Sequence, residues 1–467
     1  MNEPMHAWNL GDVLSATGGE LLHQGAESFS AVALDSRNIG KAELFVAIAG
    51  EIHDGHRFVS EVVARGAGGV VIRSDRRQDL DMELVRRAKA TVIAVGDTVA
   101  ALGALGSFRL RRCGSRVCAI TGTNGKTTTK EMCAAIFGRK FATAKNAGNF
   151  NNHIGVPLTL LALTPEIEWV ITEMGMNHPG EIAYLASLAR PDIGIVTNVG
   201  PGHLEGVGSL AGVIAAKREL IEGMEGGTAV LLADDENVIS MGRAFSGRVL
   251  TFGFSEEADV RAEDLRQEDT GTAFTLSLSG CRHQARIAAF GRHMVQNACA
   301  AAAAGMAAGV PGHRIVEGLA GFAPVAGRLT VRRLADGITV LDDTYNANPS
   351  SMAASLDTLS ALASGNRTVA ALGEMRELGA HAASEHFKLG KTAAGHGLFR
   401  LFVAGPYAGQ VEEGALSAGM APEAVVTGDR DEIAEQVKAL ARPGDFILVK
   451  GSRLSAMENV VKRLTNP

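Results

Sequence analysis

Short apolar runs alternate with amphipathic stretches along the whole chain. In the first part of the chain, the runs are bounded by turn residues, and the segment 55–67 has the periodicity of a helix. The runs lie at 28–37, 42–48, 68–73 and 90–97. Apolar runs of this length with such boundaries are typical of strands. We therefore predict a small α/β domain over residues 1–100.

A second pattern covers residues 101–328. Its apolar runs are continuous, and glycine-containing loops and helical stretches follow them. These runs lie at 116–120, 168–175, 192–200 and 227–236. Continuous apolar runs predict strands buried on both faces, and hence a mostly parallel sheet. The segment 248–280 alternates instead, which predicts an antiparallel appendage, and we expect a long helix from His293 through the alanine-rich run.

A third pattern covers residues 329–467. Strands and helices alternate there about every thirty residues, which is the spacing of βαβ units. This spacing predicts a second parallel sheet of the Rossmann-like type. The expected fold class is therefore α/β with three domains, over residues 1–100, 101–328 and 329–467.

Composition narrows the possible partners. The formal net charge is -6, which gives no general attraction to nucleic acid or to an anionic membrane and favours a small-molecule partner. The five cysteines form no C-x-x-C pair, as expected for a protein of the reducing cytoplasm. The first residues lack a basic start and an apolar run, and no run of eighteen apolar residues occurs, so we expect neither a signal peptide nor a membrane helix.

The segment "RVCAITGTNGKTTTKE" at 116–131 is almost a phosphate-binding P-loop. The usual pattern G-x-x-x-x-G-K-[ST] has a glycine where this chain has Ile120. A strand, a glycine-containing loop and a helix N-terminus together form an anion site, because backbone N–H groups and the helix dipole point at a phosphate. Lys126 would neutralise the β and γ phosphates of a nucleotide and Thr127 would ligate Mg²⁺. The expected ATP-binding residues of the loop are Gly122, Thr123, Asn124, Gly125, Lys126, Thr127 and Thr128.

Two further side chains follow later strands of the same predicted sheet. Glu173 and His203 each come after an apolar run, and parallel strands gather ligands at their carboxyl ends, so both residues could meet the metal held by Thr127. Lys217 lies in the next predicted helix. On its own it is a solvated helix lysine or an additional positive charge near the phosphates.

Three polar residues are weaker candidates for nucleotide contacts. Asn297 could contact the base, and Arg328 the γ phosphate, because arginine stabilises charge on a transferring phosphoryl group. Asp343, or its neighbour Asp342, could contact the ribose or a metal-bound water.

Taken together, these motifs resemble the Mur ligase family. They occur in the family's order and cover essentially the whole chain. The motifs are "TGTNGKTTTKE", "NAGNFNNHIGVPLTLL", "ITEMGMNHPGEI", "TNVGPGHLEGVGS", "AAKRELIEGM", "GRHMVQNA", "GRL", "DDTYNANPSSM" and "LVKGSR". The segment "ALDSRNIGKAELFVAIAGEIHDGHRFV" near the start matches as well. The shortened "TGTNGKT" loop is this family's own form of P-loop.

The resemblance implies a cytoplasmic, monomeric ligase whose three domains bind a uridine nucleotide, ATP and the incoming amine. Within the family, the motifs are most similar to those of members that join D-alanyl-D-alanine to UDP-N-acetylmuramoyl-tripeptide. Such members activate the substrate carboxylate as an acyl phosphate at the expense of ATP. The product is a pentapeptide precursor of peptidoglycan. The resemblance does not tell whether the third residue of the tripeptide is meso-diaminopimelate or lysine.

The resemblance also implies roles for particular residues. Lys126, Lys217 and His203 would be catalytic, and Lys217 matches a lysine that is carbamylated in these ligases. Two Mg²⁺ ions would be bound by Thr127, Glu173, His203 and the carbamylated Lys217. Asn297, Arg328 and Asp343 match ATP-contacting positions. The positions expected to contact the UDP-linked substrate are Ser36, Arg37, Asn151, Asn152 and Asn177.

Three alternatives stay open at this point. A ligase that adds a diamino acid to the muramoyl dipeptide would carry the string D-N-P-R, which this sequence lacks. A folylpolyglutamate synthetase shares the central fold but would lack the N-terminal module. A protein that binds ATP without ligating anything is the alternative from a different class.

Overall fold

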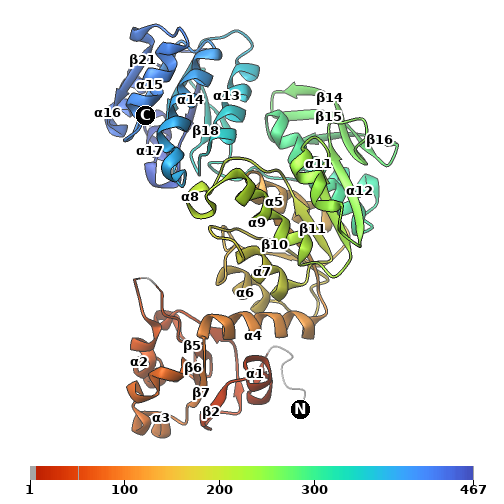
Figure 1. Cartoon of the computed structure of the whole chain (residues 1–467), viewed down its shortest axis with the longest axis vertical. Helices are drawn as coiled ribbons and strands as arrows, with labels where there is room; N and C mark the ends of the chain where they lie inside the picture. Colours follow the sequence, from red (N-terminus) through yellow and green to blue (C-terminus); the bar gives the residue numbers. More distant parts are fainter. Residues whose placement is uncertain (1–6, 51, 466–467) are drawn as a thin grey trace. The chain divides into compact units, whose positions relative to one another are not determined.

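The structure is a computed structural model that describes residues 7–50 and 52–465. The chain forms two compact units, which are described separately. The first unit consists of Met1–Val117, Ala142–Met174 and Tyr184–Arg190. The second consists of Cys118–Phe141, Gly175–Ala183 and Pro191–Pro467. Figure 1 labels many of the helices and strands of both.

The first unit contains a five-stranded sheet in the order β2-β7-β6-β5-β4. These strands are β2 (Glu20–His23), β4 (Val32–Ala33), β5 (Leu44–Val46), β6 (Gly69–Arg73) and β7 (Thr91–Val95). All neighbours are parallel except β2 and β7. Successive side chains point to opposite faces, so Val70 and Val92 belong to one hydrophobic core while Val71 and Ile93 belong to the other.

Helices cover both of these cores. Val59, Val62 and Val85 of α2 (Val59–Ala64) and α3 (Met82–Ala88) contribute to one core. Val13 of α1 (Leu10–Thr17) and Leu105 of α4 (Thr98–Cys113) contribute to the other. The small α/β module expected from the sequence is therefore confirmed.

The first unit also holds part of the central region. Strands β9 (Thr143–Lys145) and β10 (Trp169–Glu173) form a parallel pair, and α6 (Gly155–Leu161) follows β9 in the chain. Gly106 of α4 approaches α6 so closely that a Cβ atom there would lie 3.0 Å from the carbonyl oxygen of Pro157. Helix α7 (Glu181–Ala189) follows β10.

In the second unit, strands β8 (Arg116–Thr121), β11 (Ile193–Val196), β12 (Thr228–Leu232) and β13 (Arg248–Gly253) are parallel neighbours. The sheet continues with β14 (Val260–Glu268), β15 (Gly271–Leu278) and β16 (Cys281–Ile287), and β14-β15 and β15-β16 are antiparallel pairs. The antiparallel appendage expected over residues 248–280 is therefore confirmed for β14 and β15, and β16 adds a third antiparallel strand beyond that segment. The expectation is wrong for β13, which extends the parallel part.

Helices α5 (Lys126–Phe137), α8 (Leu204–Val207), α9 (Leu210–Glu222), α10 (Glu236–Ile239), α11 (Arg292–Ala307) and α12 (Gly312–Ala320) accompany this sheet. The expected helix through the alanine run is α11, and its residues Ala300 to Ala304 are fully buried. Small side chains allow α11 and α12 to approach their neighbours closely. For example, a Cβ atom at Gly305 would lie 2.6 Å from Ile136 of α5.

The C-terminal part of the second unit is a six-stranded sheet in the order β17-β18-β22-β19-β20-β21. The strands are β17 (Thr330–Arg333), β18 (Thr339–Asp343), β19 (Thr368–Leu372), β20 (Arg400–Ala404), β21 (Val425–Gly428) and β22 (Phe446–Lys450). All neighbours are parallel except the edge pair β17-β18. The predicted Rossmann-like sheet is thus confirmed.

Helices α13 (Pro349–Ala363), α14 (Ala382–Gly395), α15 (Ala408–Ser417) and α16 (Arg430–Leu440) connect these strands, and α17 (Glu458–Thr465) follows β22. Ile433 and Val437 of α16, and Val460 of α17, share a core with Val340 and Val369 of the sheet, so these two helices cover one of its faces. Within residues 7–50 and 52–465, no helix is long and apolar enough to cross a membrane.

Candidate active site

The phosphate loop connects β8 to α5, as the sequence predicts. Gly122 has a φ of 142° and Gly125 a φ of 83°, a backbone region that other residues rarely adopt. A Cβ atom would lie 1.9 Å from Thr197 Oγ1 at Gly122 and 2.2 Å from Asn297 Oδ1 at Gly125. Ile120, which replaces the first glycine of the usual pattern, is fully buried in β8. The strand therefore continues past the position where an ordinary P-loop would begin.

The residues that follow β11 hold the loop in place. The Asn124 carbonyl accepts hydrogen bonds from Thr197 Oγ1 at 2.6 Å and from Asn198 Nδ2 at 3.0 Å. The Asn124 N–H donates to Asn198 Oδ1 at 2.9 Å, and the Thr123 N–H donates to the Asn198 carbonyl at 3.1 Å. Sequence reasoning did not assign Thr197 and Asn198 to the site. The available signal was that they follow an apolar run at the ligand-binding edge of a parallel sheet.

The start of α13 also contacts the loop. Asn124 Nδ2 donates to Ser350 Oγ at 2.8 Å, and Asn348 Nδ2 donates to Asn124 Oδ1 at 2.8 Å. Asn348 and Ser350 belong to the motif "DDTYNANPSSM", in which the sequence predicts a role only for the acidic residues. These contacts connect the C-terminal sheet's first helix with the phosphate loop.

The two chemically active side chains of the loop have partners in the structure. Lys126 Nζ donates to the carbonyl oxygens of Gly122 at 2.8 Å and Thr123 at 3.2 Å. Arg328 Nη2 donates to Thr127 Oγ1 at 3.1 Å, and the Arg328 guanidinium lies 3.9 Å from the centroid of the Tyr345 ring. The structure therefore brings the predicted Lys126, Thr127 and Arg328 together at one end of α5.

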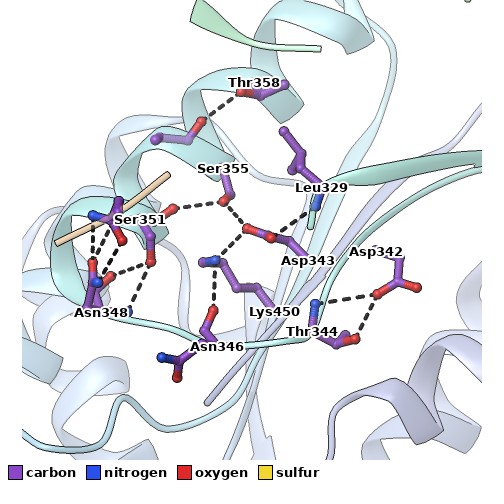
Figure 2. A network of polar contacts seen from close by, with 12 residues as sticks. Leu329, Asp342, Asp343, Thr344, Asn346, Asn348, Ser351, Ser355, Thr358 and Lys450 are labelled. Atoms are coloured by element: carbon purple, nitrogen blue, oxygen red, sulfur yellow. Dashed lines mark hydrogen bonds and ion pairs between the residues drawn. The ribbon is translucent and has the colours of Figure 1, made fainter. Parts of the chain in front are cut away.

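Asn297 lies on α11 and is 5% exposed, with its side-chain amide against Gly125. Asp343 lies at the end of β18. Its Oδ1 accepts from the Leu329 N–H at 3.0 Å, and its Oδ2 accepts from Ser355 Oγ at 2.7 Å and from Lys450 Nζ (Figure 2). Asp343 is thus bound to the linker that follows Arg328.

His203 follows a segment that touches the loop, since a Cβ atom at Gly202 would lie 2.9 Å from Thr123 Cγ2. His203 Nδ1 lies 2.7 Å from Glu377 Oε2, and the Glu205 N–H donates to the Glu377 carbonyl at 3.1 Å. The hydrogen bond from His203 holds the pKa of Glu377 below its ordinary value, although burial acts in the opposite direction. Sequence reasoning missed Glu377, because it lies in the C-terminal part of the chain.

Lys217 lies on α9 and is fully buried. The interpretation of Lys217 as a solvated helix lysine is therefore wrong, because the helix directs this position inward. Burial of an ammonium group costs free energy of folding unless its surroundings compensate the charge. Buried ionisable groups of this kind are common at functional sites.

Glu173 belongs to the first unit, where it ends β10 and is 2% exposed. Its Oε1 accepts from Asn151 Nδ2 at 2.8 Å, and its N–H donates to Asn146 Oδ1 at 2.9 Å. Asn152 Oδ1 accepts from the N–H groups of Ile154 and Gly155, at 3.2 Å and 2.9 Å. Asn151 therefore lies beside the predicted metal ligand, whereas Asn152 supports the first turn of α6.

Ser36 and Arg37 lie in the short 3-10 helix Ser36–Asn38 of the first unit. The hydrogen bonds from Arg37 lower the pKa of Asp35 to about 2. Arg65 Nη1 donates to the Ser36 carbonyl at 2.9 Å. Asn177 belongs to the second unit, and its N–H donates to Glu181 Oε2 at 2.6 Å.

The side chains at the phosphate loop suit a metal ion that is held mainly by the phosphates of a bound nucleotide. In the described part of the chain, no group of three or more His, Cys, Asp or Glu residues could hold a metal ion. The loop instead offers the Thr127 hydroxyl beside a phosphate-binding helix N-terminus, which fits Mg²⁺ bound through nucleotide phosphates.

Three segments of the chain match domain families. Residues 28–109 match the Mur ligase family catalytic domain, residues 120–305 the Mur ligase middle domain, and residues 327–453 the Mur ligase glutamate ligase domain. The chain therefore belongs to the Mur ligase family, and the expected three-domain α/β architecture is confirmed. The exact boundaries at residues 100 and 328 stay predictions.

Among its relatives is the UDP-N-acetylmuramoyl-tripeptide–D-alanyl-D-alanine ligase of Escherichia coli strain K12, which is 38% identical over 97% of both chains. The crystal structure of MurF from Acinetobacter baumannii is 31% identical and covers 100% of both chains, with a TM-score of 0.90. The structure of a MurF ligase from Thermotoga maritima in complex with ADP is 26% identical, covers 93% of this chain and 97% of that chain, and has a TM-score of 0.81.

Proposed function

We propose that this protein joins D-alanyl-D-alanine to UDP-N-acetylmuramoyl-tripeptide in an ATP-dependent reaction. The observation that carries this proposal is the short phosphate loop with Lys126, Thr127 and Arg328, in a chain that is similar over nearly its full length to ligases of this specificity. The solved relative in complex with ADP supports the use of an adenine nucleotide by this chain.

The chemistry requires activation of a carboxylate. A carboxylate is a poor electrophile, so one of its oxygens first attacks the γ phosphorus of ATP, and ADP leaves. In the resulting acyl phosphate, the amine of D-alanyl-D-alanine attacks the carbonyl carbon. The tetrahedral intermediate then loses phosphate, which carries away the attacking carboxylate oxygen, and the amine loses a proton. Lys126 and Arg328 would stabilise the charge on the transferred phosphoryl group.

Mg²⁺ would reduce the repulsion between the carboxylate and the triphosphate. We assign Thr127, Glu173 and His203 as residues that would hold two such ions. We also propose that the Lys217 side chain loses a proton and that the neutral amine then adds CO₂ and releases a second proton, which gives an anionic carbamate that would serve as a metal ligand. The complete burial of Lys217 supports this assignment, because a buried lysine loses its charge more readily than an exposed one.

The N-terminal domain, with Ser36 and Arg37, would contact the uridine nucleotide. Asn151, Asn152 and Asn177 would contact the muramoyl peptide. Asn297, Arg328 and Asp343 would contact ATP. The C-terminal domain would bind D-alanyl-D-alanine. We propose that the enzyme acts as a monomer in the cytoplasm.

The test is phosphate release from ATP with each substrate added separately and together. The proposal requires release that depends on both UDP-N-acetylmuramoyl-tripeptide and D-alanyl-D-alanine. Turnover with UDP-N-acetylmuramoyl-dipeptide and a diamino acid would instead support the preceding ligation step. ATP turnover unaffected by either pair would support the non-catalytic alternative. A competition between the meso-diaminopimelate and lysine tripeptides would then identify the third residue.

A further inference from the structure

The turn at residues 327–329 connects the central region to the C-terminal sheet through an unfavourable backbone conformation. Gly327 has a φ of 70°, and Leu329 has a φ of 52° although it carries a branched side chain. Such a residue stays in the left-handed region only when its surroundings hold it there. Leu329 is 2% exposed, so the turn is packed within the protein.

Two hydrogen bonds with residues at the end of β18 hold this turn in its conformation. The Leu329 N–H donates to Asp343 Oδ1 at 3.0 Å, and the Tyr345 N–H donates to the Gly327 carbonyl at 3.0 Å. Both partners come from residues 343–345. The end of β18 therefore determines the conformation on each side of Arg328.

The conformation of the turn places Arg328. Its Nη2 donates to Thr127 Oγ1 at 3.1 Å, and its guanidinium lies over the ring of Tyr345. Both contacts depend on the position of the Arg328 backbone, because the side chain extends from it. A change in the turn would thus move the guanidinium away from the phosphate loop.

Lys450 fixes the carboxylate on which the turn depends. Asp343 and Lys450 are direct neighbours at the ends of the parallel strands β18 and β22. Lys450 is 1% exposed, and its Nζ donates to Asp343 Oδ2 and, at 3.1 Å, to the Asn346 carbonyl (Figure 2). Burial raises the pKa of Asp343, but the charge and hydrogen bond of Lys450 outweigh this effect and keep the pKa below its ordinary value.

We propose that Lys450 is a positioning residue for Arg328. It holds Asp343, Asp343 holds the Leu329 N–H, and the resulting turn directs Arg328 to Thr127. Lys450 also begins the segment 450–453 of the C-terminal domain, so this chain of contacts connects that domain to the phosphate loop. The consequence for catalysis rests on the proposed function, whereas the consequence for the turn does not.

The first test measures hydrogen exchange in the full-length protein without ligands. In Lys450→Met, the peptide covering residues 327–331 is expected to exchange at least about tenfold faster than in the wild type. Lys388→Met is the matched control, because Lys388 also pairs with a carboxylate, Glu385, but is 66% exposed. It should leave this peptide unchanged. Unchanged exchange in folded Lys450→Met would overturn the proposal.

A milder variant covers the case in which Lys450→Met does not fold. Lys450→Gln removes the positive charge that pairs with Asp343 but keeps a polar side chain at this buried position. Faster exchange in the same peptide, with the rest of the protein unchanged, would support the proposal. Wild-type exchange in folded Lys450→Gln would overturn it, because the ion pair would then not hold the turn.

The second test is a double-mutant cycle on acyl phosphate formation without the acceptor dipeptide. Lys450→Met and Arg328→Ala are each expected to lower the rate, and the double variant should be about as slow as Arg328→Ala alone. Multiplicative losses would contradict a positioning role, and so would a wild-type rate of acyl phosphate formation in Lys450→Met. If the wild type formed no acyl phosphate, the proposed function would fail, while the exchange result would still stand.

Discussion

Replacement of Gly122 by alanine tests the account of the shortened phosphate loop. Gly122 has a φ of 142°, which lies outside the regions open to alanine. Its Cβ atom would lie 1.9 Å from Thr197 Oγ1 and 3.2 Å from the Asn198 carbonyl oxygen. Thr197 is 1% exposed, and its hydroxyl donates to the Asn124 carbonyl at 2.6 Å. Rotation of Thr197 away from the new methyl group would break this bond.

Two contributions determine how much Gly122→Ala lowers the free energy of unfolding. The backbone strain of a non-glycine residue in such a conformation costs about 1–3 kcal/mol. The loss of hydrogen bonds from a buried hydroxyl costs a further ~1–3 kcal/mol. Together, Gly122→Ala should lower the free energy of unfolding by roughly 2–6 kcal/mol, a large part of the 5–15 kcal/mol typical of a protein. Phosphate binding should weaken as well, because the loop carbonyls and N–H groups move.

Urea unfolding followed by circular dichroism, and calorimetry with a non-hydrolysable ATP analogue, measure the two effects. Gly114→Ala is the matched control, since Gly114 has a φ of 70° but a Cβ atom there would contact nothing within 4 Å. It should cost only about 1–2 kcal/mol. The double variant Gly122→Ala/Thr197→Ala should regain part of the stability. Wild-type stability and affinity in Gly122→Ala would refute the reasoning.

Further predictions concern three charged or titratable groups. Lys126→Ala should abolish acyl phosphate formation while the circular dichroism spectrum stays that of the wild type, and detectable acyl phosphate would contradict its role. Lys217→Ala should lose at least about a hundredfold in activity and remain folded, and normal turnover would disprove the carbamate. Burial lowers the pKa of His293 to about 4, with Asp343 and Lys450 acting in opposite directions. Because the unfolded chain binds a proton near pH 6.5 and the folded chain does not, stability should fall between pH 6.5 and pH 4, by roughly 3 kcal/mol at most, and His293→Gln should flatten this dependence in urea titrations.

The local structure of the loop could be predicted from the sequence. The apolar run at 116–120 became β8, and the helix begins at Lys126, because a buried strand, glycines and a helix start are each encoded by neighbouring residues. The parallel C-terminal sheet followed from its regular spacing for the same reason.

Contacts between distant segments could not be predicted in this way. Thr197 meets the loop because β11 lies next to β8, and Lys450 meets Asp343 because β22 lies next to β18. A local sequence pattern does not predict which strands will be neighbours in a sheet. Glu377 contacts His203 although the two residues are far apart in the sequence. The burial of Lys217 depends on how α9 packs. The local sequence of Lys217 favours an exposed side chain, whereas the structure buries it. The role that the family resemblance implies for Lys217 stays a prediction.

The most direct test of the central claim follows the oxygen atoms. The tripeptide substrate would be labelled with ¹⁸O in the carboxylate that accepts the dipeptide, and the inorganic phosphate formed with ATP and D-alanyl-D-alanine would be analysed by mass spectrometry. An acyl phosphate mechanism predicts one ¹⁸O atom in each phosphate released from doubly labelled carboxylate, together with the UDP-N-acetylmuramoyl-pentapeptide. Phosphate without ¹⁸O, formed at the same rate as the ligated product, would contradict the activation of the carboxylate by ATP.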